Sequence, residues 1–208
     1  MPNSNTLKIS SFEKRVKRRI TGREHSFFAV CTPGLKKVCF NEMLGAGFSK
    51  NDIKITPGGI DFKARFNSLM SLNFNLRSPL RILMRISSFK ADSFKKFEKK
   101  INSIDWILYL PQNCSLQFRV TSKKSRLYHS DALAQRCEQI ILNKLQDKDA
   151  FIAKNQSIQT IYIRAEQNFF TISLDTTGEL LFKRGIKKKV IKAPLRENIA
   201  FAMLSWAG

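Results

Sequence analysis

The sequence contains few of the residues from which metal sites and nucleophilic sites are usually built. Its 208 residues include only two histidines, and its four cysteines form no C-x-x-C pair. The cysteines are Cys31, Cys39, Cys114 and Cys137. Because zinc sites need Cys and His ligands at short spacings, no zinc site is expected. In a reducing cytoplasm the four thiols would act as small, partly buried hydrophobic side chains.

The motifs of common catalytic sites are also missing. The sequence has no Gly-rich phosphate loop and no G-x-S-x-G nucleophile elbow. Five carboxylates lie near expected turns or helix ends, where capping and turn formation explain them without acid–base chemistry. They are Asp52, Asp61, Asp131, Asp149 and Asp175. We therefore expect no catalytic residue, cofactor site or metal site in this chain.

Long apolar segments are absent as well. No run of about 18 apolar residues is present, and residues 1–25 contain no apolar core of a secretion signal. These two absences favour a soluble, cytoplasmic protein that does not span a membrane.

What the sequence has in excess is positive charge. Its 37 Lys and Arg residues outnumber 16 Asp and Glu residues, which gives a net charge of +21. The hydrophobic fraction of 43% is ordinary for a globular protein, so the charge belongs to a folded body. Its positive potential attracts polyanions, of which nucleic acid is the first expectation and an anionic membrane surface the second.

Residues 26–89 alternate between strand and helix patterns. SFFAVC is a short apolar strand, and a helix follows in TPGLKKVCFNEMLGAG, with Thr32 as its cap and Pro33 in its first turn. Two strands are predicted in NDIKI and GIDFKA. A second helix is predicted in NSLMSLNFNLR, and a further strand in LRILMRISSF. The order β-α-β-β-α-β is that of a ferredoxin-like domain. We assign residues 26–66 to it, with the boundary to the next domain anywhere between 66 and 92.

A second, α/β domain is expected over residues 67–185, so that the fold class is α+β. Asp92 is the expected cap of a short helix, and SLQFRVT alternates as a strand. Ser130 is the expected cap of the long helix SDALAQRCEQIILNKLQDK. IQTIYIR and FFTISLD predict a hairpin across the turn AEQN, and LLFKR predicts the last strand.

The two ends of the chain carry basic clusters. Residues 1–25 include KRVKRR and little apolar periodicity, which predicts a disordered arm, either a solvated tail or a phosphate-binding extension. Residues 186–208 are expected to form a basic linker and then a helix that starts at Ala193 and Pro194. The apolar stripe of this helix would be Leu195, Ile199, Met203 and Trp206, and it would need a partner to cover it.

The loop TSKKSRLYHS, residues 121–130, is the strongest candidate for a binding site. Its cationic side chains and hydroxyl groups suit phosphate, its two rings suit an unpaired base, and the helix start after it favours an anion. The candidate RNA-contacting residues are Lys123, Lys124, Ser125, Arg126, Tyr128 and His129. The alternative is a plain basic loop in which Tyr128 packs on the core and Ser130 only caps the helix.

A second basic segment, FKRGIKKKVIK, provides further candidates. Gly185 would let the chain turn or approach a ligand closely. The candidate RNA-contacting residues are Lys183, Arg184, Gly185, Lys187, Lys188 and Lys189. Taken alone, such a charge run is more often a solvated linker, and it is a candidate site only together with the loop of residues 121–130.

Several of these segments together resemble a known family. They are similar to segments in the N-terminal part of THUMP-domain RNA methyltransferases. The segments are TPGLKKVCFNEMLGAG, GGIDFKA, SKKSRLYHS, and RG followed shortly by APLRE. More narrowly, they resemble bacterial 23S rRNA guanine-N2 methyltransferases. The resemblance covers residues 26–207. It implies a ferredoxin-like domain followed by a THUMP domain, which is an RNA-binding module, with 23S rRNA as partner. The residues that would face the RNA are Lys123, Lys124, Arg126, His129, Lys183, Arg184 and Gly185. For residues 187–189 the alternatives are an RNA contact and an interdomain linker.

In that family, a Rossmann-type domain that uses S-adenosylmethionine follows the segment resembling KAPLRENIAFAML. Its D-P-x-C-G-S-G-T loop and its Asn-Pro-Pro-aromatic motif are both absent from this sequence. The resemblance therefore implies an RNA-binding module that acts with a methyltransferase domain in cis or in trans. The alternatives are a stand-alone accessory subunit of an rRNA- or tRNA-modifying enzyme, an intact enzyme, and, last, a membrane-surface protein.

Overall fold

The computed structural model describes residues 11–146, 157–183 and 195–208. Seven strands form one sheet in the order β2-β3-β1-β4-β7-β6-β5. All neighbouring strands in this sheet are antiparallel except β5 and β6, which are parallel. The α+β class expected from the sequence is confirmed. None of the described helices is long and apolar enough to cross a membrane.

The N-terminal half follows the predicted β-α-β-β-α-β order. Its elements are β1 (Glu24–Cys31), α2 (Lys36–Gly45), β2 (Ile53–Thr56), β3 (Gly59–Arg65), α3 (Leu69–Asn75) and β4 (Pro79–Lys90). Helix α2 starts later than expected, because Pro33 lies in a turn in which the Leu35 N–H donates to the Thr32 carbonyl over 3.0 Å. Gly34, with φ of +89°, supports that turn. No side chain caps α2, so Thr32 as its cap was a wrong prediction.

The C-terminal half packs two helices against three strands. Its elements are α4 (Phe94–Asn102), η3 (Trp106–Leu108), β5 (Cys114–Lys123), α5 (Ser130–Leu145), β6 (Ser157–Glu166) and β7 (Phe169–Asp175). The prediction that Ser130 caps the long helix was wrong, since Ser130 is already its first residue and no side chain caps it.

The predicted last strand, LLFKR, was also wrong. Its described part forms the short 3₁₀ helix η4 (Leu181–Lys183), and Leu181 is buried in the N-terminal core. The Lys183 N–H donates to the Leu180 carbonyl over 2.8 Å, so the segment forms a local turn and not a strand ladder.

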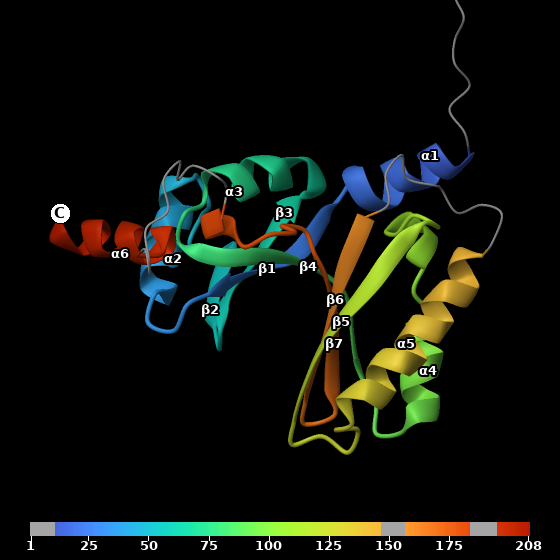
Figure 1. Cartoon of the computed structure of the whole chain (residues 1–208). Helices are drawn as coiled ribbons and strands as arrows, with labels where there is room; N and C mark the ends of the chain where they lie inside the picture. Colours follow the sequence, from blue (N-terminus) through green and yellow to red (C-terminus); the bar gives the residue numbers. More distant parts are fainter. Residues whose placement is uncertain (1–10, 147–156, 184–194) are drawn as a thin grey trace, which may run out of the picture.

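Strand β4 joins the two halves. Residues 79–85 pair with β1 and residues 83–90 pair with β7, with a bulge between Arg85 and Ser87. Met84, in the core under α2 and α3, is the register partner of Leu174, in the core under α4 and α5. Paired residues point to the same side of a sheet, so these four helices cover one face. Figure 1 shows α2 and α3 over one half and α4 and α5 along the other.

The basic cluster KRVKRR is ordered, which corrects the predicted disordered arm for residues 11–25. It lies in α1 (Ser11–Val16) and in η1 (Lys17–Thr21), a π-helical turn that continues it. Arg15 and Arg19 both pair with Asp105 at 3.0 Å, and Ile20 is buried. Phe12, Val16 and Ile20 recur every four residues and are half-buried or buried, a pattern that the many charged residues between them obscured.

Helix α6 (Glu197–Ala207) closes the described chain and starts after Arg196, whose backbone is extended. Ala193 and Pro194, the predicted start, lie outside the described residues. Asn198 and Ala202 are buried, Ala202 against Leu35 and Val38 of the α2 region. The side chains of Met203, Leu204 and Trp206 are exposed.

Candidate nucleic-acid interface

The basic loop of residues 121–130 lies at one end of the sheet. β5 and β6 end here, β7 begins here, and β4 ends beside β7, because Lys90 is the register partner of Phe169. The N-terminus of α5 follows directly. Figure 1 shows this end at the bottom of the molecule.

The loop is held by the turn between β6 and β7. The Arg126 N–H donates to Asn168 Oδ1 over 2.7 Å, and the Asn168 N–H donates to Ser125 Oγ over 2.9 Å. The Gln167 N–H donates to the Lys123 carbonyl over 3.0 Å. In turn, the Asn168 carbonyl accepts from the Ala91 N–H over 2.9 Å. One asparagine therefore ties the loop to two other segments.

Backbone conformation marks the same place. In the described ranges, the non-glycine residues with positive φ are Lys124 at 50°, Gln167 at 52° and Asn168 at 63°. Two successive positive values suit the two-residue hairpin turn of Gln167 and Asn168. For Lys124 the left-handed conformation is unfavourable, and such residues persist where surrounding contacts impose them, often at binding sites.

The loop presents its cationic side chains to solvent. Lys123, Lys124 and Arg126 are exposed, and in the described part of the chain none of them forms an ion pair. Glu166, the nearby carboxylate, pairs with Arg164 at 3.0 Å. The charges are thus available to an outside anion.

The rings of Tyr128 and His129 lie side by side on the surface. Their centroids are 4.1 Å apart, and Tyr128 is 63% exposed. Leu127 is the buried residue of the loop, and its carbonyl accepts from Ser122 Oγ over 2.9 Å. The alternative in which Tyr128 packs on the core was therefore wrong. The free N–H groups at the α5 start favour an anion, although Asp131 in the first turn already offsets part of that effect.

The second basic segment is only partly described. Lys183 ends η4 and pairs with Glu179 at 3.3 Å. Arg184, Gly185, Lys187, Lys188 and Lys189 lie outside the described residues. Since η4 follows the far end of β7, a strand of seven residues or about 20 Å, the structure does not bring Lys183 to the loop.

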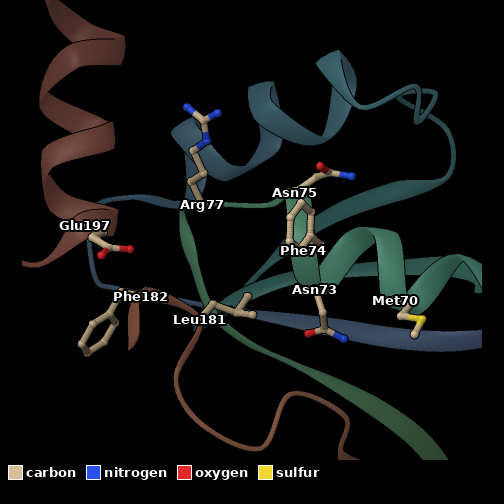
Figure 2. Close-up of a pocket in the computed structure, with 8 residues that line it drawn as sticks. All are labelled: Met70, Asn73, Phe74, Asn75, Arg77, Leu181, Phe182 and Glu197. Atoms are coloured by element: carbon tan, nitrogen blue, oxygen red, sulfur yellow. The ribbon is translucent and has the colours of Figure 1, made fainter. Parts of the chain in front are cut away.

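Beside η4 is a cavity that the sequence did not reveal. It has a volume of about 560 Å³, and Figure 2 shows that its walls come from α3, the segment after α3, η4 and the start of α6. Its lining residues are Met70, Asn73, Phe74, Asn75, Arg77, Leu181, Phe182 and Glu197. The Asn73 amide is already bonded, to the Leu69 and Thr176 carbonyls and to the Thr177 hydroxyl. The Asn73 amide therefore stabilises the fold and is not available to a ligand in the cavity.

The described residues do not fit an S-adenosylmethionine site of the Rossmann type. Such sites use a Gly-rich turn between a strand and a helix of a parallel sheet, where the backbone approaches the ligand closely. The parallel pair here is β5 and β6, and residues 121–130, which follow β5, contain no glycine. No catalytic step is derived for this chain.

Comparison with known proteins confirms the resemblance. Residues 26–83 match the family model of the RlmL ferredoxin-like domain. "Putative RNA methyltransferase slr0064" of a Synechocystis species is 29% identical over 185 residues, which cover 88% of this chain and 48% of that protein. "Ribosomal RNA large subunit methyltransferase K/L" of Cellvibrio japonicus is 26% identical, covering 88% of this chain and 25% of that protein.

Solved structures show the same arrangement. The structure of "SMU.472, a putative methyltransferase complexed with SAH" is 27% identical with a TM-score of 0.75, covering 88% of this chain and 49% of that one. A methylase structure from Listeria monocytogenes has a TM-score of 0.77 at 22% identity, which shows the fold alone. The chain therefore spans half or less of the length of these relatives.

Proposed function

We propose that this chain is the RNA-binding part of an S-adenosylmethionine-dependent rRNA guanine-N2 methyltransferase, with 23S rRNA as its partner. It would consist of the ferredoxin-like domain followed by a THUMP domain. The names of the rRNA methyltransferase relatives and the SAH-bound neighbour support the reaction class. We set the domain division near Ala91, within the predicted interval of 66–92, because α3 and β4 contribute to the N-terminal core.

One observation carries the proposal: the anchored basic loop. Lys123, Lys124 and Arg126, which pair with no carboxylate among the described residues, stand next to an exposed ring pair on a backbone fixed by Asn168. Cationic side chains bind phosphate and position the protein, while rings stack on unpaired bases. A fixed loop loses little conformational entropy on binding, so these contacts translate into affinity. Lys183 and the basic segment after it remain proposed RNA contacts on the strength of the sequence.

The test is a mobility shift with 23S rRNA fragments at several salt concentrations. We expect the triple variant Lys123→Ala, Lys124→Ala, Arg126→Ala to weaken binding by about 1 kcal/mol or more per residue. Each lost phosphate contact should also lower the slope of log affinity against log salt by about one.

A matched control comes from α4. Lys95, Lys99 and Lys100 are exposed on that helix, and replacing all three by Ala removes the same charge at another place. Equal losses for both triple variants would mean that net charge alone attracts RNA, and the loop would not be the site. Unchanged affinity of the loop variant would reject the proposed interface.

The exposed apolar side of α6 favours a partner domain. Met203, Leu204 and Trp206 are 54%, 72% and 65% exposed on a helix whose other side is packed on the fold. Exposed apolar clusters of this kind mark interaction surfaces. We propose that they contact the methyltransferase domain, which would bind S-adenosylmethionine. That domain acts in cis, or in trans if the chain is an accessory subunit; co-purification separates the two.

A further inference from the structure

The face of the sheet opposite the four helices carries a row of polar and cationic side chains. Register partners follow one another across the strands, from Arg119 to Tyr162, Ser173, Arg85, Ser26 and Lys63. They share this face because neighbouring residues Phe118, Ile163 and Met84 belong to the helix-covered cores. With strands about 4.8 Å apart, the row spans about 24 Å.

The centre of the row is hollowed into a cleft of about 170 Å³. Only strand residues line it: Phe28, Val30, Leu83, Arg85, Arg119, Thr121, Tyr162, Ile163, Arg164, Thr171 and Ser173. Apolar cavities of about 150 Å³ accommodate a single benzene ring. The cleft is thus the size of one flat ring system, with hydroxyl groups and guanidinium groups around it.

The cleft is lined by three arginines, which differ in their contacts. Arg164 pairs with Glu166 at 3.0 Å. Arg85 is fixed, since its Nε donates to Asp61 Oδ1 over 2.7 Å and its guanidinium lies 4.5 Å from the Phe28 ring centre. Arg119 is exposed, and no carboxylate of residues 11–146, 157–183 or 195–208 pairs with it. A fixed donor suits recognition of a base edge, and an unpaired surface cation suits a phosphate.

Tyr162 stands between Arg119 and Arg85 in the row. Its ring is half-buried, with the Arg81 guanidinium 5.8 Å from the ring centre. Burial raises the pKa of the Tyr162 hydroxyl above its ordinary value, which already lies well above neutral pH, so the group can donate a hydrogen bond. A half-buried ring beside the Arg81 guanidinium, on the sheet face opposite the four helices, is a surface on which a base can stack.

We propose that this cleft holds one unpaired base of a single-stranded RNA segment that crosses the sheet, with Arg119 on an adjoining phosphate. The inference rests on the proposed function and adds the kind of RNA that is bound. A base inside a duplex is stacked and paired and cannot enter a cleft of this size. The single-stranded segment would therefore flank whatever structured RNA the basic loop contacts.

The first test compares two labelled RNAs of equal composition by fluorescence anisotropy, one single-stranded and one a closed hairpin. We expect Arg119→Ala and Tyr162→Leu each to lower the affinity for the single-stranded RNA by about fivefold or more, because stacking and charge contacts of one nucleotide contribute that much. The affinity for the hairpin should change by less than about twofold. Lys100→Ala is the control, since it removes one charge from α4.

The outcomes separate this inference from the proposed function. If Arg119→Ala and Tyr162→Leu change the single-strand affinity no more than Lys100→Ala does, while the loop variant weakens it, the cleft is not a site and the proposed function stands. If no RNA binds to any form of the chain, both are rejected.

A second test uses the unchanged chain, so it does not depend on the folding of a variant. A 4-thiouridine at the middle of the single strand is photo-crosslinked, and the modified residues are identified by mass spectrometry. Crosslinks at Arg119, Tyr162 or their neighbours on β5 and β6 are the expected result. Crosslinks confined to residues 124–130 would overturn the inference.

Discussion

At the scale of single residues, Asn168 determines the geometry of the basic loop. Its side chain accepts from the Arg126 N–H, and its own N–H donates to Ser125, with both partners more than 40 positions earlier in the chain. Its φ of +63° is one that asparagine tolerates better than most residues. Asn168 therefore adopts the backbone conformation that the β6–β7 turn requires and also holds the distant loop by two hydrogen bonds.

Replacement of Asn168 by Gly should separate these two roles. Glycine keeps the positive φ of the turn but removes the Oδ1 acceptor, so a loop N–H loses its partner at a cost of about 1 kcal/mol. We expect RNA affinity to fall several-fold, as measured by anisotropy, with a small loss in the urea midpoint.

The control for this variant is Gln167→Gly. Gln167 has the same left-handed backbone, with φ of 52°, but its side chain makes no hydrogen bond in the described part of the chain. Its replacement should leave RNA affinity unchanged and stability equal or higher. A loss of affinity in Gln167→Gly equal to that in Asn168→Gly would mean that turn flexibility, and not the Asn168 bond, is responsible.

The sequence predicted the chemistry of the loop residues but not what fixes them. Exposed charge at Lys123, Lys124 and Arg126 follows from composition. The Asn168 contact does not, because it depends on pairing between strands that are far apart in sequence. Capping was predicted poorly: no side chain caps α4 or α5. Asp92 instead pairs with Lys96 at 2.9 Å, and that hydrogen bond holds the pKa of Asp92 below its usual value.

At the scale of elements, alternation and helical periodicity identified the strands and helices that bury a face. The exceptions are elements that depend on distant contacts. Helix α1 and the turn after it contact distant residues: Arg15 and Arg19 pair with Asp105, about ninety positions later, and Ile20 is buried. The 3₁₀ turn η4 replaces the predicted strand LLFKR and places Leu181 in the N-terminal core, which is built mostly from residues more than 90 positions earlier. Local pattern cannot report either condition.

Removing the Asp105 charge should loosen α1. Asp105→Asn keeps the shape of the side chain but weakens both ion pairs, and partly exposed pairs are worth about 0–1 kcal/mol each. We expect faster amide hydrogen exchange in residues 11–21, with a global urea midpoint that changes little. Asp92→Asn, which breaks a local pair within the α4 region, is the control and should leave exchange in α1 unaltered. If amide exchange in α1 is as slow in Asp105→Asn as in the unchanged chain, the ion pairs do not hold the helix and burial of Ile20 does.

At the scale of the whole molecule, the sequence predicted two domains, and the structure joins their strands in one sheet. Two cores exist, one under α2 and α3 and one under α4 and α5, and the half-buried Ile86 and Tyr109 touch both. The joint is β4, whose 12 residues are longer than either domain needs alone. Its pairing with β7 links positions some ninety residues apart, and no periodicity in the sequence encodes such a link.

This shared strand predicts that the two cores unfold together. Residues 83–85 of β4 have register partners in both β1 and β7, so unfolding either half removes hydrogen bonds from the other. The chain supplies its own probes: Cys31 and Cys39 are buried in the N-terminal core, and Cys114 and Cys137 in the C-terminal core. Burial also raises the pKa of Cys137 to about 12, so the native thiol reacts slowly.

The measurement is a short thiol-labelling pulse at increasing urea, with each cysteine quantified separately by mass spectrometry. A cooperative molecule gives the same midpoint for all four thiols, because labelling then reports one transition. Larger proteins often unfold domain by domain. Two midpoints, one for Cys31 and Cys39 and another for Cys114 and Cys137, would therefore mean that the bonds of residues 83–85 are too weak to couple the cores. A single midpoint would mean that RNA bound on either half stabilises the whole chain, since a ligand that binds only the folded state stabilises every part that unfolds with its site.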